Sequence, residues 1–175
     1  EIKQAVGNRG SVLAGTGTYD TAESIELTQA AERAGADAVL LTTPYYSKPP
    51  QEGLYRHFAA IAGSTSLPCV IYNIPGRTGV NVTLETQLRI AEIPNIAGVK
   101  EASGDLVQIA AIVESAPRSY RVWSGDDALN LPILAVGGYG AISVAAHLVG
   151  TQMQRMIQEY LAGQHEEAGA IHRRL

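Results

Sequence analysis

The sequence predicts an α/β fold with a parallel sheet, and two regularities support that prediction. Short apolar runs rich in β-branched residues recur along the 175-residue chain, about one for each β-loop-α unit. Amphipathic segments that begin at helix-capping residues lie between these runs. Because consecutive parallel strands need long crossover connections, which are usually helices, this alternation is typical of α/β domains.

Six apolar runs are predicted to be buried strands. Their residues are apolar at most positions rather than at every second one, which indicates strands that are covered on both faces. The runs are residues 11–15, 37–43, 69–74, 96–102, 120–125 and 140–146.

Capping residues predict where the intervening helices begin and end. Asp20 and Glu23 form a capping-box pattern for a helix that ends at Gly35. The last segment is expected to be helical with a break at Gly163. Other helices are expected at residues 51–62 after Pro50, 84–92 after Thr83, 106–116 between Asp105 and Pro117, and from Asp127 to the Gly137-Gly138 pair.

Two architectures fit this order of elements, an open doubly wound sheet and a closed (β/α) barrel. A complete barrel has eight β/α units and typically about 250 residues. Only six strands are counted here, preceded by a segment that resembles the end of a helix. The pattern alone leaves both architectures open.

Composition excludes several classes of function. A net charge of −4 and a pI near 5.5 leave no basic surface for nucleic acid. No apolar stretch approaches the roughly 20 residues that a membrane helix needs. The single cysteine, Cys69, lies in an apolar run and is expected to be a buried thiol, which fits a reducing, cytoplasmic location.

Three common chemistries find little support. The loop "GTGTYD" has Asp20 where a dinucleotide-binding loop needs its third glycine, so a tight turn explains it better. The four histidines show no metal-ligand spacing, and no metal site is predicted. The nucleophile pattern GxSxG is absent.

Lys100 is the residue that indicates chemistry, because it ends an apolar strand where an aliphatic side chain would pack better. The carboxyl ends of parallel strands meet at one rim, and burial there lowers a lysine pKa toward the neutral amine that attacks a ketone. Tyr72 and Arg77 follow the preceding strand, and Tyr46 follows the strand before that. The set suits Schiff-base chemistry with a small keto acid.

Five ordered motifs resemble those of the 4-hydroxy-tetrahydrodipicolinate synthase (dihydrodipicolinate synthase) family of pyruvate-dependent class I aldolases. They are "TPYYSKPPQEGLYRHF", "IYNIPGRTG", "GVKEASGD", "SGDDALNLP" and "GAISV". The resemblance implies a (β/α)8 TIM barrel in which the six strands are strands three to eight, with the first two strands and part of the C-terminal helices missing. It implies a partial barrel domain over residues 1–150, and the last barrel helix with the start of the helical region over 151–175.

The resemblance also implies roles for individual residues. Lys100 would form the imine with pyruvate without any other cofactor, Tyr72 and Tyr46 would relay protons, and Arg77 would hold the carboxylate of L-aspartate 4-semialdehyde. Gly125 and Ile142 would line the pyruvate pocket.

The same resemblance implies a cytoplasmic homotetramer built as a dimer of dimers. Tyr45, Glu23 and Tyr19 would lie at the subunit interface and its allosteric pocket. Tyr19 stands where the family often has asparagine, so feedback inhibition by lysine is not predicted.

One further departure and three alternatives accompany this hypothesis. The threonine pair that binds the pyruvate carboxylate in the family has no counterpart here, so a chain of this extent is expected to be inactive by itself. The alternatives are a 2-keto-3-deoxy sugar acid aldolase, an N-acetylneuraminate lyase and a non-catalytic barrel. Arg77 argues against the lyase, because a sugar does not need a cation at that place.

Overall fold

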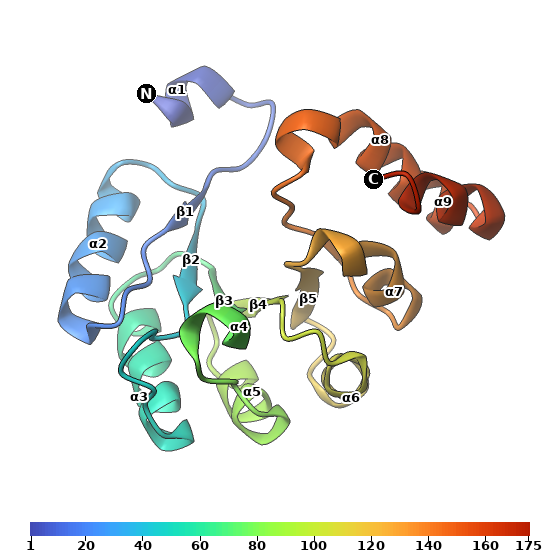
Figure 1. The fold of residues 1–175 in the computed structure, drawn as a ribbon. Coiled ribbons are helices and arrows are strands. Elements are labelled where there is room, and N and C mark those ends of the chain that lie inside the picture. Colours follow the sequence, from blue (N-terminus) through green and yellow to red (C-terminus); the bar gives the residue numbers. More distant parts are fainter.

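The computed structural model describes residues 1–175 and contains six strands and nine α-helices (Figure 1). The strands are β1 (Leu13–Gly15), β2 (Ala38–Thr42), β3 (Cys69–Asn73), β4 (Ile96–Glu101), β5 (Arg121–Ser124) and β6 (Gly140–Ala141). The helices are α1 (Ile2–Val6), α2 (Thr21–Arg33), α3 (Gln51–Ala62), α4 (Pro75–Thr78), α5 (Leu84–Ala91), α6 (Leu106–Ser115), α7 (Asn130–Ala135), α8 (Ala146–Leu161) and α9 (His165–His172). A 3-10 turn, η1 (Asp127–Leu129), precedes α7.

The strand order decides between the two predicted architectures. All neighbouring strands are parallel, and they follow chain order from β1 to β6 without a reversal. A doubly wound sheet reverses its strand order at a switch point, whereas a (β/α) barrel does not. The helices α2, α3, α5, α6 and α7 follow one another around the sheet (Figure 1). The fold is therefore part of a (β/α) barrel.

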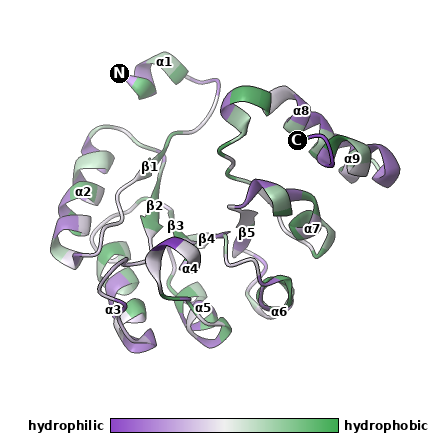
Figure 2. Cartoon of the chain, viewed as in Figure 1, coloured by the Kyte–Doolittle hydropathy of each residue, from purple (hydrophilic) through white to green (hydrophobic).

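Alternation along the strands separates an outer from an inner face. Outward side chains such as Val39, Ile71 and Val99 are fully buried, and they pack with helix residues such as Phe58 and Ile112 in one hydrophobic core. Figure 2 shows that α2, α3 and α5 each carry hydrophobic and hydrophilic residues, as helices with one covered face do. The main core thus lies between sheet and helices, and the inner face carries the alternate side chains, both apolar and polar.

A β-bulge resets the register of β4 just before its functional end. Cys69 pairs with Ile96, but the next residue, Val70, pairs with Gly98, so Ala97 is the extra residue. Gly98 has a φ of 152°, and a Cβ there would lie within 1.9 Å of the Arg121 carbonyl oxygen. Glycine is therefore required at this position, and the bulge determines which side chains of β4 face inward.

Most predicted elements are confirmed, and the differences have local causes. The last strand has two residues instead of seven, because Ala146 already begins α8. The cap before η1 is Asp126 rather than Asp127, since the Asp126 carboxylate accepts the N–H of Ala128 at 3.0 Å. The short helix α4 was not predicted.

The capping box at α2 is half formed. The Asp20 carboxylate accepts the N–H of Glu23 at 2.9 Å, as predicted. The N–H of Asp20 donates to the hydroxyl of Thr18 at 3.1 Å instead of to the Glu23 side chain. One of the two bonds of the box is enough to begin the helix at Thr21.

The C-terminal helices form a small second core. Met153 and Met156 of α8 pack with Ala168 of α9, and the break between the helices falls at Gly163, which has a φ of 80°. The predicted division at residue 150 lies inside α8, which bends at Val149. None of the helices is both long and apolar enough to cross a membrane.

Candidate active site

A row of side chains crosses the inner face of the sheet at one level. The strand register aligns Thr42 with Tyr72, Tyr72 with Lys100, and Lys100 with Trp123. Each of these residues stands at or next to the carboxyl end of its strand. In (β/α) barrels catalytic groups lie at this end. The row therefore marks the candidate active site, and Lys100 stands in its middle.

Lys100 lies in a nearly dry environment. Its side chain is buried, with 7% of the residue exposed, and its Nζ lies 4.0 Å from the centroid of the Tyr72 ring. Burial lowers the pKa of Lys100, and the negative charge of Asp127 opposes this effect. A lower pKa increases the fraction of neutral amine near pH 7, which is the nucleophilic form.

The turn after β5 packs against the stem of Lys100. The Gly125 N–H donates to the Glu101 carbonyl oxygen at 2.8 Å. A Cβ at residue 125 would lie 2.9 Å from both Cγ and Cε of Lys100, so only glycine fits without moving the lysine. Gly125, predicted to line the pyruvate pocket, thus contacts the lysine directly.

Glu101 does not pair with Lys100, because adjacent residues of a strand point to opposite faces. Its fully buried carboxylate accepts bonds from Asn73 Nδ2 and Gln87 Nε2, both at 2.9 Å, and from the N–H of Ser103 at 3.1 Å. Burial raises the pKa of Glu101, and these hydrogen bonds oppose the rise. The network ties the end of β4 to β3 and α5.

Tyr72 and Arg77 lie at the same rim. Burial raises the pKa of the Tyr72 hydroxyl, the positive charge of Arg77 lowers it, and Asp126 raises it further. Arg77 is exposed at the end of α4 and makes no ion pair. The guanidinium is thus available to an anion close to Tyr72.

Tyr46 stands apart from this row. It is 92% exposed, and its backbone has a φ of 67°, which is rare for a residue other than glycine. The Ser47 N–H donates to the Tyr45 carbonyl oxygen at 2.7 Å across it, which makes a strained three-residue turn. The relay role of Tyr46 stays a prediction, because the fold turns its side chain into solvent.

Tyr45 and Tyr19 lie side by side, as the resemblance implies for one pocket. Their ring centroids are 5.4 Å apart in an edge-to-face arrangement, and both rings are partly exposed. Glu23 lies in the first turn of α2, close to Tyr19 in the sequence, and its side chain accepts no hydrogen bond. An interface role for these residues is compatible with their exposure and stays a prediction.

Ile142 is held to the same rim by the backbone. Its N–H donates to the Ser124 carbonyl oxygen at 2.8 Å, which places it beside the turn that contacts Lys100. Asp127, in that turn, accepts bonds from the N–H groups of Val144 at 3.2 Å and Ala145 at 2.8 Å. The two loops after β5 and β6 are therefore joined.

Sequence reasoning missed the two ends of the row, Thr42 and Trp123. Trp123 is the only tryptophan of the chain, and its ring contacts Tyr139 edge to face with centroids 5.6 Å apart. The signal was present, since both residues lie near the ends of predicted strands. Their alignment with Lys100 requires the register, which the bulge at Gly98 sets.

Comparison with known proteins shows the family to which the chain belongs. The model of the dihydrodipicolinate synthetase family matches residues 1–175. The chain belongs to this family. A curated 4-hydroxy-tetrahydrodipicolinate synthase of Moorella thermoacetica is 57% identical over 175 residues, which are 100% of this chain and 60% of the relative.

Two further relatives agree with the family assignment. A curated 4-hydroxy-tetrahydrodipicolinate synthase 1 of Halalkalibacterium halodurans is 55% identical over 99% of this chain and 59% of its own length. The lysine-bound crystal structure of the synthase from Cyanidioschyzon merolae has a TM-score of 0.96 and 47% identity over 99% of this chain and 59% of that one. The chain thus spans about three fifths of the length of the relatives it matches.

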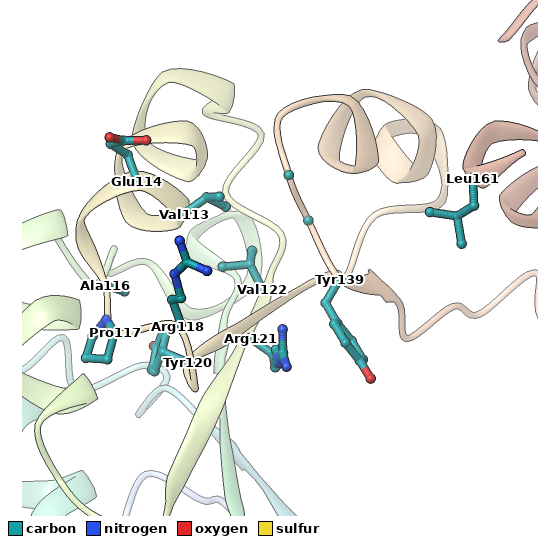
Figure 3. A pocket seen from close by; sticks show the side chains of 12 residues that line it. Val113, Glu114, Ala116, Pro117, Arg118, Tyr120, Arg121, Val122, Tyr139 and Leu161 are labelled. Carbon is teal, nitrogen blue, oxygen red and sulfur yellow. The ribbon is translucent and has the colours of Figure 1, made fainter. Parts of the chain in front are cut away.

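The largest cleft of this family member lies away from the Lys100 row. It has a volume of about 900 Å³ and lies at the amino ends of β5 and β6 (Figure 3). Arg121 and Tyr139 line it, and the guanidinium carbon of Arg121 lies 4.6 Å from the Tyr139 ring centroid. Because the chemistry of barrels gathers at the carboxyl ends, the site is assigned from the residues rather than from the volume of this cleft.

Proposed function

We propose that the whole protein to which this chain belongs condenses pyruvate with L-aspartate 4-semialdehyde to give 4-hydroxy-tetrahydrodipicolinate, a step of lysine and diaminopimelate biosynthesis. The observation that carries this proposal is the buried Lys100 amine against the Tyr72 ring, at the carboxyl end of a parallel strand. Membership of the dihydrodipicolinate synthetase family supports it.

The first step uses the neutral amine of Lys100. Nζ attacks the C2 carbonyl of pyruvate, water leaves, and a protonated imine forms. The imine then loses a proton from C3 and becomes an enamine. Lys100 carries the reaction covalently, so the proposal needs no other cofactor. The low exposure of the lysine favours this step, because burial favours the neutral, nucleophilic form of the amine and keeps bulk water away from it.

The second step forms the carbon–carbon bond. C3 of the enamine attacks the aldehyde carbon of the semialdehyde, and the new alkoxide takes a proton before ring closure. Tyr72 is the proton donor in this proposal, because its hydroxyl lies on the same rim and keeps its proton at neutral pH. Arg77 binds the carboxylate of the semialdehyde, and Gly125 and Ile142 line the pyruvate pocket.

The proposal extends to assembly and location. Tyr46 is 92% exposed in the single chain, and it would join the relay of a neighbouring site if a second chain packed against it. Together with the partly exposed Tyr19–Tyr45 pair, this supports association between chains, which we take to be a homotetramer built from dimers. The cytoplasm is the proposed location. Tyr19 occupies the place of an asparagine, so we expect no feedback inhibition by lysine.

Arg77→Ala tests the choice of substrate. The whole protein and its variant are assayed with pyruvate and several aldehydes, and the product is identified by mass spectrometry. Because a charge-assisted contact with a carboxylate is lost, we expect kcat/KM for the semialdehyde to fall by the equivalent of about 2–4 kcal/mol of transition-state stabilisation. Imine formation with pyruvate should persist. Arg118→Ala, at the amino end of β5, is the matched control.

Two outcomes would contradict the assignment. Unchanged semialdehyde kinetics in Arg77→Ala would remove Arg77 from the substrate site. A strong preference of the unsubstituted protein for a sugar-derived aldehyde would favour the sugar acid aldolase. Imine formation without turnover of any aldehyde would favour a binding protein.

A further inference from the structure

The amino end of α8 is capped partly by Ser143, whose Oγ accepts the N–H of Ala146 at 2.9 Å, and partly by another element. Its N-cap residue, Ala145, has no side chain that can accept a hydrogen bond, and no acidic residue lies in its first turn. The carboxylate of Asp127 in η1 accepts the N–H groups of Val144 and Ala145 instead, at 3.2 and 2.8 Å. Asp127 therefore stabilises a helix that begins about twenty residues later in the chain.

The same carboxylate is close in sequence and structure to the Lys100 stem. Gly125, two residues before Asp127, packs on Cγ and Cε of Lys100. The N–H of Ile142 donates to the carbonyl of Ser124, next to this contact. Asp127 thus lies where the turn against the lysine meets the segment that leads from β6 into α8.

We propose that Asp127 is a positioning residue that fixes the turn on the Lys100 stem to the start of α8 and places its negative charge toward the lysine amine. This inference rests on the proposed function where it concerns the protonated imine, which is a cation on Nζ. Burial favours the neutral amine that begins the reaction, whereas a nearby carboxylate stabilises the cation that follows. Asp127 offsets part of the cost of that charge.

The charged groups around Lys100 allow this role. From β3, the titratable group that faces it is Tyr72, with Arg77 beyond it, and from the turn after β5 it is Asp127, while the charge of Asp126 acts on Tyr72. Glu101 lies on the opposite face of β4. Of these, Asp127 is the carboxylate whose charge acts on the pKa of Lys100, and it raises that pKa.

Asp127 is ionised at neutral pH. Burial would raise its pKa, but hydrogen bonds from Ser143, Ala145, Asn130 and Val144 outweigh burial and lower it. The carboxylate is therefore a fixed negative charge across the pH range in which the amine titrates.

Asp127→Asn removes the negative charge but keeps an oxygen atom that can cap α8. The amide oxygen can still accept the N–H groups of Val144 and Ala145. The amide nitrogen would replace Oδ1 of Asp127, which now accepts Nδ2 of Asn130 at 3.2 Å, so the Asn130 amide must turn to present its own unpartnered Oδ1 to the new donor. Asp127→Ala removes both charge and cap. Asp105→Asn is the matched control, since Asp105 caps α6 in the same way through Val107 and Gln108.

The test measures acetylation of Lys100 by acetic anhydride as a function of pH, followed by peptide mass mapping. Asp127→Asn should move the midpoint of Lys100 labelling to lower pH, because the charge that favours the ammonium form is gone, whereas Asp105→Asn should leave it in place. Asp127→Ala should also speed hydrogen exchange at Val144 and Ala145 about tenfold, as loss of a cap does.

The outcomes distinguish the two proposals. An unchanged labelling midpoint in Asp127→Asn would overturn the charge effect, and unchanged exchange in Asp127→Ala would overturn the positioning role. Pyruvate and borohydride are tested separately on the unsubstituted protein. If no adduct forms there, the proposed function fails, while the labelling and exchange results still decide the role of Asp127.

Discussion

The Nζ of Lys100 lies 4.0 Å from the centroid of the Tyr72 ring, and the two residues are direct partners in the β3–β4 register. The ring face attracts the charged form of the amine, while burial favours the neutral form. The tyrosine therefore serves Lys100 in two ways, since its ring packs against the amine and its hydroxyl can carry a proton.

Tyr72→Phe separates these two contributions. The variant keeps the ring beside Lys100 and loses only the hydroxyl. We expect imine formation with pyruvate to continue and turnover to slow by roughly 10²-fold, the usual effect of losing general acid–base help. Steady-state kinetics and borohydride trapping measure the two effects. Tyr160→Phe on α8 is the control, and near-normal turnover in Tyr72→Phe would exclude Tyr72 from proton transfer.

Gly125→Ala tests the contact between the turn and the lysine. The added Cβ would lie 2.9 Å from two carbons of Lys100 and 3.2 Å from the Cβ of Ala102, so the lysine must move. We expect the yield of pyruvate adduct at Lys100 to fall at least severalfold, with little change in thermal stability. In Gly76→Ala, where a Cβ meets nothing within 4 Å, the yield should be unchanged. Equal yields in both variants would show that the turn adapts.

The Glu101 network is expected to matter for stability. Glu101→Ala removes one acceptor each from Asn73 and Gln87, which keep their bonds to Asn81 Oδ1 at 2.7 Å and to the Val82 carbonyl oxygen at 3.2 Å. It also removes the acceptor of the Ser103 N–H, and we expect a loss of about 1–3 kcal/mol in the free energy of unfolding. Glu101→Gln keeps one acceptor oxygen and should lose less. Urea unfolding monitored by circular dichroism measures both variants. Equal losses would mean that packing, not hydrogen bonding, holds the end of β4.

The strands and helices were largely predictable because their signals are local. Asp20, Thr83 and Asp105 are caps that depend only on the next few residues, and all three accept the expected backbone N–H groups. The sixth strand was predicted too long because "GAISVAA" is apolar at every position except Ser143. The strand ends at Ala141, and Asp127 accepts the N–H groups of Val144 and Ala145, a long-range contact that leaves no mark in the local sequence.

The site was predictable at its centre and not at its edges. Lys100 stood out because a lysine is unexpected at the end of an apolar run. Its packing against Tyr72 follows from register, which a glycine bulge shifts by one residue. Tyr46 was expected at the same rim, but its positive φ turns it outward, and backbone strain of this kind cannot be read from "PYYS".

His57 is expected to make the protein sensitive to acid. Burial lowers its pKa from 6.5 to about 4, and the charge of Asp20 opposes that change. Between these values the unfolded chain binds more protons than the folded one, so stability falls as pH falls. From pH 7.5 to 5.0 the loss should be about 2 kcal/mol.

The His57→Gln variant isolates this effect. Its amide can still bond to the Thr21 hydroxyl, which lies 2.9 Å from Nδ1 of His57, and it does not titrate. Urea unfolding at the two pH values should show a smaller acid-induced loss in the variant than in the unsubstituted protein. His147→Gln, at an exposed position, should behave like the unsubstituted protein. The same acid-induced loss in all three proteins would assign the sensitivity to other groups.

Reduction with borohydride in the presence of pyruvate, followed by peptide mass mapping, tests the central claim most directly. The account predicts a pyruvate-derived mass increase on Lys100 that vanishes in Lys100→Arg and persists in Lys48→Arg, whose lysine lies in an exposed loop. An adduct on another lysine, or none on Lys100 in the folded protein, would contradict it.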